Sequence, residues 1–112
     1  MNVEVQRQDG NLIALVEGAV DGNNAAHFQS VLQDAVQEGD NAMVLDMEKL
    51  TYISSAGLRV LLLVAKDLQK KGAPFAICSL SGQVMELFTV SGFDQIIAIH
   101  DTRDLALASF NT

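Results

Sequence analysis

Hydrophobic and polar positions follow two different periods along the chain, and the first third shows both. In the opening segment Val3, Val5 and Arg7 alternate with Glu4, Gln6 and Gln8 up to Asp9-Gly10, a two-residue turn signal, and the apolar run Leu12–Val16 follows. This pattern predicts a β-hairpin. The apolar residues of the next segment recur every three to four positions and are Phe28, Val31, Leu32 and Ala35. Their spacing predicts a helix that ends near Gly39.

The middle of the chain combines a short apolar run with a long amphipathic segment. Met43–Leu45 is apolar throughout, which is typical of a strand buried on both faces, and we expect this strand to end at Asp46. Ser55–Lys71 has the helical period and ends in basic residues before Gly72, a common signal for a helix C-terminus. The apolar residues expected on the core face of this helix are Leu58, Leu61, Leu62, Ala65 and Leu68.

The last third repeats the alternation of strand and helix. Phe75–Cys78 predicts a strand, and Ser81 is placed to cap the next helix, which should end at Ser91-Gly92. Ile96–Ile99 predicts one more strand, and Asp101 is placed to cap a final helix. The predicted order is ββαβαβαβα, an α/β fold with an open mixed sheet, because strict alternation favours parallel strands joined by right-handed crossovers.

Length and charge limit the classes of protein to consider. The 112 residues suffice for one domain with its own core and are too few for two, so residues 1–112 are interpreted as a single domain. Fourteen acidic and seven basic residues give a formal net charge of −7, which disfavours nucleic acid as a partner. The longest apolar run, Val60–Ala65, is far shorter than a bilayer span. We therefore expect a soluble, cytoplasmic protein with no membrane partner.

Side chains typical of metal or redox chemistry are sparse. Cys78 is the single cysteine and lies in an apolar run, so it cannot form an internal disulfide and is expected to be buried. Its spacing from His27 and His100 is not typical of a metal site, so we expect two exposed histidines and no metal or other cofactor. A lone cysteine also favours a reducing compartment.

Ligand sites in open α/β sheets tend to follow the carboxyl ends of strands, which draws attention to segments 18–24 and 47–55. The second segment joins the apolar strand to the longest predicted helix through Ser54, Ser55 and Gly57. The simplest interpretation is that one serine caps the helix. Gly57 in the first helical turn costs about 1 kcal/mol relative to alanine, so we expect something to approach the backbone there. A helix N-terminus also stabilises a phosphate, which makes Ser55 a candidate for phosphorylation.

The face of this helix opposite its expected core carries a second feature. Its residues, which lie at helical offsets of four, seven and eleven, are Arg59, Leu63, Lys66 and Lys70. Charged stripes of this kind are usually solvated surface. Because this one begins one turn from Ser55, it is also a candidate docking surface, with Arg59 and Leu63 as the residues that a partner would bury.

The segment Leu50–Leu61, which contains the run Ile53-Ser54-Ser55-Ala56-Gly57-Leu58, resembles the signature of the STAS-domain anti-sigma factor antagonists. The predicted element order matches that family over nearly the whole chain. The resemblance implies that Ser55 is the phosphorylated serine and that Gly57 belongs to the same site. It further implies that Asp21, in the segment Gly18–Asp21, faces this serine and helps a partner kinase to act.

By this resemblance, the unphosphorylated domain binds an anti-sigma factor that is also a serine kinase, and so frees a sigma factor. Phosphorylation of Ser55 ends the binding until a serine phosphatase restores it. Ser54 stands where many members have Asp, and Ala56 stands where many have a second hydroxyl residue. The register favours Ser55 over Ser54 as the modified residue, and Ala56 excludes a second phosphorylation at its position.

The alternative function classes are an enzyme, a receiver-like domain and a STAS module that is never phosphorylated. An enzyme of the Gly-x-Ser-x-Gly type is disfavoured because Ile53 occupies the first glycine position, and the phosphate-binding motif Gly-x-x-x-x-Gly-Lys-Ser/Thr does not occur. A stronger alternative is a receiver-like domain phosphorylated on Asp46 with bound Mg²⁺, since a carboxylate at the end of a central strand suits that role. The acidic cluster and the lysine that accompany it in receivers are missing. A STAS interaction module that is never phosphorylated is a third alternative.

Overall fold

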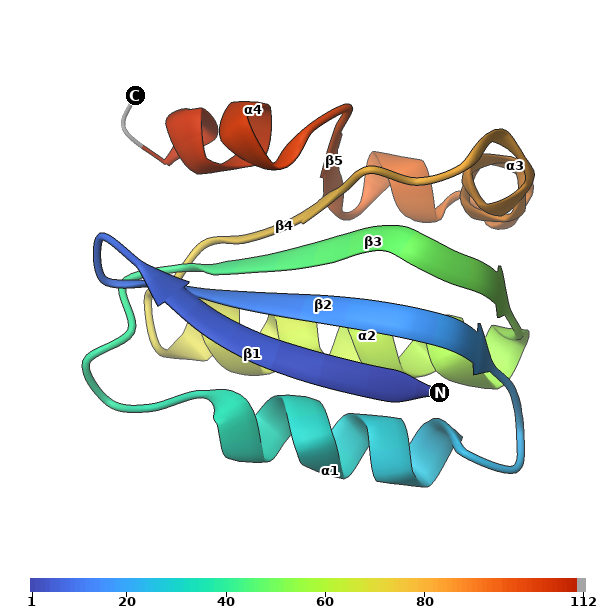
Figure 1. Ribbon diagram of the computed structural model, residues 1–112, viewed down its shortest axis with the longest axis horizontal. Helices are drawn as coiled ribbons and strands as arrows, with labels where there is room; N and C mark the ends of the chain where they lie inside the picture. Colours follow the sequence, from blue (N-terminus) through green and yellow to red (C-terminus); the bar gives the residue numbers. More distant parts are fainter. Residues whose placement is uncertain (111–112) are drawn as a thin grey trace.

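One mixed sheet of five strands organises the part of the chain that the computed structural model describes, residues 1–110 (Figure 1). Its strands, in spatial as well as chain order, are β1 (Asn2–Gln8), β2 (Asn11–Val20), β3 (Met43–Ile53), β4 (Phe75–Cys78) and β5 (Ala98–His100). β1 is antiparallel to β2, and each later strand is parallel to the one before it. Asp9 and Gly10 between β1 and β2 both have positive φ, which suits the tight turn of the predicted hairpin.

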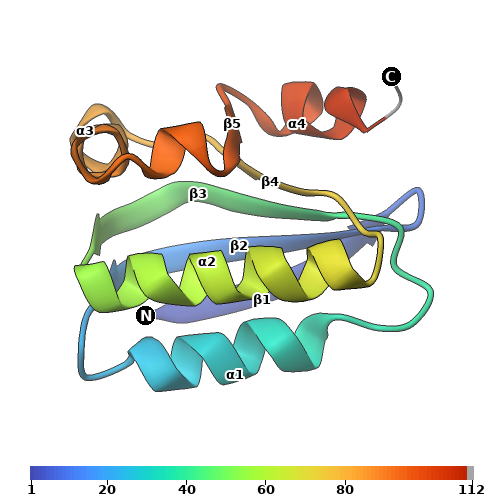
Figure 2. The same cartoon turned by 180° about the vertical axis from the view of Figure 1, so that it is seen from behind.

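Helices cover both faces of this sheet. They are α1 (Ala25–Ala35), α2 (Ser55–Lys70), α3 (Gly82–Ser91), the 3-10 helix η1 (Phe93–Gln95) and α4 (Arg103–Ser109). α1, α2 and α3 contribute to the main hydrophobic core on one face, and Figure 2 shows α1 and α2 lying next to each other in front of the sheet. α4 covers a smaller cluster on the other face, where Ala106 joins Ile13, Val44 and Ala76.

The predicted element order and the parallel pairing of the later strands are confirmed. Local signals at the ends of α2 and α3 are confirmed as well, whereas α1 ends at Ala35, before Gly39, where the sequence was expected to stop it. The Ser81 Oγ accepts a hydrogen bond from the Val84 N–H at 3.3 Å and so caps α3. Gly72 and Gly92, just beyond α2 and α3, have φ values of +74° and +80°, the left-handed conformation that ends many helices.

The prediction that the central strand ends at Asp46 is wrong. β3 continues to Ile53, and its pairing with β2 shifts register twice, once near Val16 and once after Gly18. The prediction relied on the short apolar run Met43–Leu45. At each shift β3 has one extra residue, which breaks the two-residue alternation in the second half of the strand, so this half carries no simple strand pattern in its sequence. The buried residues of β3 are accordingly Met43 to Met47, Leu50 and Ile53. Residues 47–53, expected to form a loop, instead lead as a strand directly to the start of α2.

Two boundaries in the last third also differ from the predictions. β5 begins at Ala98 and not at Ile96, because Ile96 closes the turn after η1 and is exposed. The residue that caps α4 is Thr102 and not Asp101, because the Thr102 hydroxyl accepts a hydrogen bond from the Leu105 N–H at 3.1 Å. A hydroxyl one residue nearer the helix therefore takes the capping position.

The buried face of α2 differs in part from the prediction. Its buried residues are Gly57, Leu58, Val60, Leu61, Val64 and Leu68. Leu62 and Ala65, expected in the core, are only half-buried. The buried face is turned toward α1, which packs along the flank of α2 that carries Val64 and Asp67. The Asp67 carboxylate accepts a hydrogen bond from Gln33 of α1 at 3.2 Å.

Candidate functional site

The carboxyl ends of β2 and β3 lie side by side and bring two connecting segments together. Val20 and Ile53 are partners at the end of the parallel pairing. Just beyond this pair, the Ser54 N–H donates a hydrogen bond to the Val20 carbonyl at 2.8 Å. Asp21, which follows Val20, and Ser54, which follows Ile53, therefore leave the sheet at adjacent points.

The two serines at the start of α2 have different surroundings. Ser54 is the N-cap residue and is half-buried, and its Oγ accepts a hydrogen bond from the Gly57 N–H at 3.3 Å. Ser55 is the first residue of α2 and is exposed, and none of the described residues forms a hydrogen bond with its hydroxyl. Capping thus occupies Ser54 and leaves the Ser55 hydroxyl available at the positive end of a helix.

Asp21 begins a turn that its own side chain holds in place. The Asp21 Oδ1 accepts hydrogen bonds from the N–H groups of Asn23 and Asn24, at 2.8 and 3.3 Å. The Asn24 Oδ1 accepts a hydrogen bond from the Asp21 N–H at 2.9 Å, and its Nδ2 donates one to the Ala19 carbonyl at 3.0 Å. These bonds fix Asp21 at the junction of the two segments. Sequence reasoning missed Asn24, although the run Asp21-Gly22-Asn23-Asn24 is a turn signal that could have indicated it.

Gly57 lies where α2 packs tightly against the ends of β2 and β3. A Cβ atom on this residue would lie 2.6 Å from the Ile53 Cγ1 and 2.9 Å from the Val20 Cγ1. The close approach expected at Gly57 therefore exists, but it comes from the protein's own core. Because Gly57 is buried, its part in the site is to let the helix start next to the two strand ends, and it offers no surface to a partner.

The stripe on α2 is exposed as predicted, since Arg59, Leu63, Lys66 and Lys70 all lie at the surface. Leu63 is 39% exposed, a large fraction for an apolar side chain in the middle of a helix. Tyr52, near the end of β3, is 47% exposed and was not singled out from the sequence. The register shift after Gly18 places Thr51 and Tyr52 at the surface in succession, and simple alternation gives no signal of such a shift.

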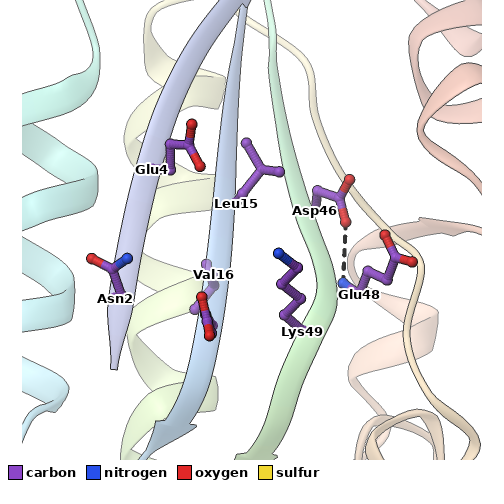
Figure 3. Close-up of a pocket in the computed structure, with 8 residues that line it drawn as sticks. Asn2, Glu4, Leu15, Val16, Asp46, Glu48 and Lys49 are labelled. Carbon is purple, nitrogen blue, oxygen red and sulfur yellow. Dashed lines mark hydrogen bonds between the residues drawn. The ribbon is translucent and has the colours of Figure 1, made fainter.

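Asp46 lies within β3 and is 5% exposed. Its Oδ2 accepts hydrogen bonds from the Arg103 Nη2 and Nε at 2.9 and 3.1 Å, and its Oδ1 accepts one from the Glu48 N–H at 3.1 Å. A pocket of about 40 Å³ lies beside it and is lined by residues of β1, β2 and β3 (Figure 3). Within residues 1–110, no three His, Cys, Asp or Glu side chains are grouped to hold a metal ion. The carboxylate of the receiver-like alternative is therefore buried and ion-paired, which does not favour that alternative.

The remaining candidate side chains are one cysteine and two histidines. Cys78 is buried as predicted, and burial raises the pKa of its thiol above the ordinary value. His27 is exposed as predicted, but the expectation for His100 is wrong. His100 is half-buried in the last position of β5, where α4 packs, and its buried Nε2 has no hydrogen-bond partner among the described residues. None of the helices in residues 1–110 has the length and apolar character needed to cross a bilayer.

Comparisons with known proteins identify similar chains in several bacteria. BtrV of Bordetella bronchiseptica, provisionally named an anti-sigma factor antagonist, is 41% identical over 112 residues, which are 100% of this chain and 97% of BtrV. The anti-sigma F factor antagonist of Paenibacillus polymyxa is 28% identical over 108 residues, which are 96% of this chain and 92% of that protein.

A solved structure has the same fold. The crystal structure of a Thermotoga maritima protein, provisionally named an anti-sigma factor antagonist, has a TM-score of 0.90 and covers 98% of this chain and 95% of its own. At 22% sequence identity, this likeness concerns the fold alone. The STAS domain family matches residues 2–106, nearly the whole chain. This chain therefore belongs to the STAS domain family.

Proposed function

We propose that this protein is a phosphorylation-switched anti-sigma factor antagonist of the bacterial cytoplasm. The unphosphorylated domain binds an anti-sigma factor that is also a serine kinase, and so releases the sigma factor. The kinase phosphorylates Ser55, which ends the binding, and a serine phosphatase restores the active form. The domain acts by binding and performs no catalysis of its own. The names of BtrV and of the Paenibacillus polymyxa relative support the antagonist role.

The observation that carries this proposal is the exposure of the Ser55 hydroxyl. Its hydroxyl is exposed at the first position of α2 and has no hydrogen-bond partner within residues 1–110. The first N–H groups of a helix lack intrahelical partners, so they can receive a phosphate on this side chain with little rearrangement. Ser54, the neighbouring hydroxyl, already accepts the Gly57 N–H. The Ser55 hydroxyl is therefore both exposed to a kinase and placed where the helix can stabilise a phosphate.

Three neighbouring residues support Ser55 in this proposal. Asp21 leaves the sheet beside the start of α2, where its carboxylate assists the kinase. Ser54 keeps the first turn of α2 in place through its hydrogen bond to Gly57. Gly57 allows that turn to lie against Val20 and Ile53, which brings the two segments together. Arg59 and Leu63 continue the partner surface along the exposed side of α2.

The switch follows from electrostatics at an interface. Phosphorylation adds a charge of about −1.5 to −2 at pH 7 to a domain whose formal net charge is already −7. A partner that buries this dianion must desolvate it, which costs several kcal/mol unless the partner compensates the charge. The helix N-terminus stabilises the same group by about 0.3–1 kcal/mol, so the fold tolerates the phosphate while the interface does not.

The test is to incubate the protein with its cognate kinase and ATP and to locate the phosphate by peptide mass mapping. We expect one phosphate, on Ser55. The variant Ser55→Ala should bind the kinase and remain unmodified, and Ser54→Ala should still be modified. Phosphate on Ser54 would contradict the assignment. Labelling of Asp46 by a small phosphodonor with Mg²⁺ and without kinase would favour the receiver-like alternative, and kinase binding without any modification would favour a passive module.

A further inference from the structure

The free positive charge of this domain is concentrated on one helix. Of its seven basic residues, Arg7 pairs with Asp40 and Arg103 pairs with Asp46, each at 2.9 Å or less. The other five form no ion pair within residues 1–110: three lie exposed on α2, Lys71 follows as its C-cap residue, and Lys49 lies on β3. We define the cationic stripe as Arg59, Leu63, Lys66 and Lys70. A domain with an acidic balance therefore presents one surface of the opposite sign.

The cationic stripe has the geometry of a docking surface. Its members are separated by four, three and four residues, so they share the face of α2 that lies opposite the buried Leu61 and Leu68. At a rise of about 1.5 Å per residue, the stripe extends roughly 16 Å along the helix. Leu63 lies between the charges and is 39% exposed, which supplies an apolar contact for a partner to bury. The single acidic residue of α2, Asp67, accepts a hydrogen bond from Gln33 and is only half-exposed on the flank.

We infer that the cationic stripe docks on an acidic surface of the anti-sigma factor kinase, an inference that rests on the proposed function. The partner's charge follows from complementarity. An acidic surface is repelled by most of this domain, whose net charge is −7, and is attracted along α2. Complementary charge of this kind orients the encounter and raises the association rate, while repulsion between like charges suppresses other orientations. A basic partner surface would be drawn to the acidic remainder of the domain.

Phosphorylation then acts directly on the cationic stripe. Ser55 and Arg59 are separated by four residues in α2, a spacing that makes side chains neighbours on a helix. A phosphate on Ser55 can therefore pair with the Arg59 guanidinium, which removes Arg59 from the partner contact. The formal charge around the stripe falls from +3 to about +1, since the phosphate contributes up to about −2 at pH 7. The same dianion repels the acidic partner surface.

The experiment measures association with the cognate kinase by stopped-flow fluorescence at about 0.05 M and about 0.5 M salt, on either side of the ionic strength at which the Debye length is about 10 Å. Lys66→Glu is the main variant, and Lys49→Glu is its matched control, because Lys49 is an exposed lysine on β3 outside the stripe. We expect Lys66→Glu to slow association at low salt by about tenfold and Lys49→Glu by less than about twofold. The triple variant Arg59→Glu, Lys66→Glu, Lys70→Glu should also lose most of the salt dependence.

The outcomes separate this inference from the proposed function. If wild-type protein binds the kinase and is phosphorylated on Ser55, while the triple variant associates as fast as wild type, the inference is wrong and the proposed function stands. Faster association of the triple variant would show that the partner surface is basic, which also overturns the inference. Failure of the wild-type protein to bind any anti-sigma factor kinase overturns both. Recovery of Lys66→Glu binding when one surface carboxylate of the kinase is changed to lysine would identify the acidic surface directly. Circular dichroism controls for folding.

Discussion

Ser55 and Asp46 are two possible phosphate acceptors, one just beyond β3 and one within it, and they differ in burial and in hydrogen bonding. Asp46 lies inside β3, is 5% exposed and is held by Arg103 at 2.9 Å. Ser55 lies two residues beyond β3, is exposed, and has no hydrogen bond to the described residues. The position of a reactive group along a central strand therefore says little about its role. Burial and hydrogen bonding decide which group a partner enzyme can reach.

Replacing the buried residue, Asp46, should lower the free energy of unfolding more than the other substitutions below. Asp46→Ala leaves Arg103 without its carboxylate partner and removes hydrogen bonds to a charged group, each typically worth about 1.5–3 kcal/mol. We expect the free energy of unfolding, measured by urea denaturation, to fall by about 2–3 kcal/mol. Glu48→Ala, an exposed neighbour on the same strand, should change it by less than about 0.5 kcal/mol. Similar values for the two variants would show that the Asp46–Arg103 pair does not stabilise the fold.

Local sequence signals predicted the ends of elements better than the length of the central strand. α2 could be predicted because Ser54 caps it, Gly72 follows it and its apolar residues recur with the helical period. The second half of β3 could not, because its two register shifts exist only in the pairing with β2. Asp46 was consequently expected at a strand end facing a loop, whereas β3 carries it into the interior beneath Arg103. The pairing of β3 with β2 belongs to the tertiary structure, so the sequence of β3 alone does not reveal it.

In the candidate site, too, local sequence signals predicted some features, and others depend on tertiary contacts. The resemblance to the STAS signature singled out Ser55, which is exposed at the first position of α2, and its modification stays a prediction. The cost of Gly57 in a helix indicated a close approach. That the approaching atoms belong to Val20 and Ile53 depends on how β2 and β3 end side by side. Asn24 was missed because its importance lies in hydrogen bonds to Asp21 and Ala19, which only the folded turn brings together.

A smaller loss of stability is expected at Gly57, which positions the start of α2 and with it Ser55. In Gly57→Ala the new methyl group meets Ile53 and Val20 at 2.6 and 2.9 Å, and overpacking typically costs about 1–3 kcal/mol. Because both contacts are shorter than 3.0 Å, the cost should lie in the upper half of this range. Alanine gains about 1 kcal/mol in a helix, so we expect a net loss of about 1–2 kcal/mol in urea denaturation. Gly82→Ala is the matched control, because Gly82 also lies in the first turn of a helix and its Cβ would meet nothing within 4 Å. That variant should be neutral or stabilised, and equal losses at both positions would rule out the packing explanation.

The smallest difference in stability is expected between alanine variants of the two adjacent serines, Ser54 and Ser55. Ser54→Ala removes the Oγ that accepts the Gly57 N–H, and loss of such a cap typically costs about 1 kcal/mol. Ser55→Ala removes an exposed hydroxyl without a partner in the described structure, so its effect should stay within about 0.5 kcal/mol. Both variants are measured by thermal unfolding, where about 1 kcal/mol corresponds to a shift of about 4 °C for a domain of this size. If Ser55→Ala proves the more destabilising of the two, its hydroxyl has a structural role in α2, and the case for Ser55 as the free acceptor fails.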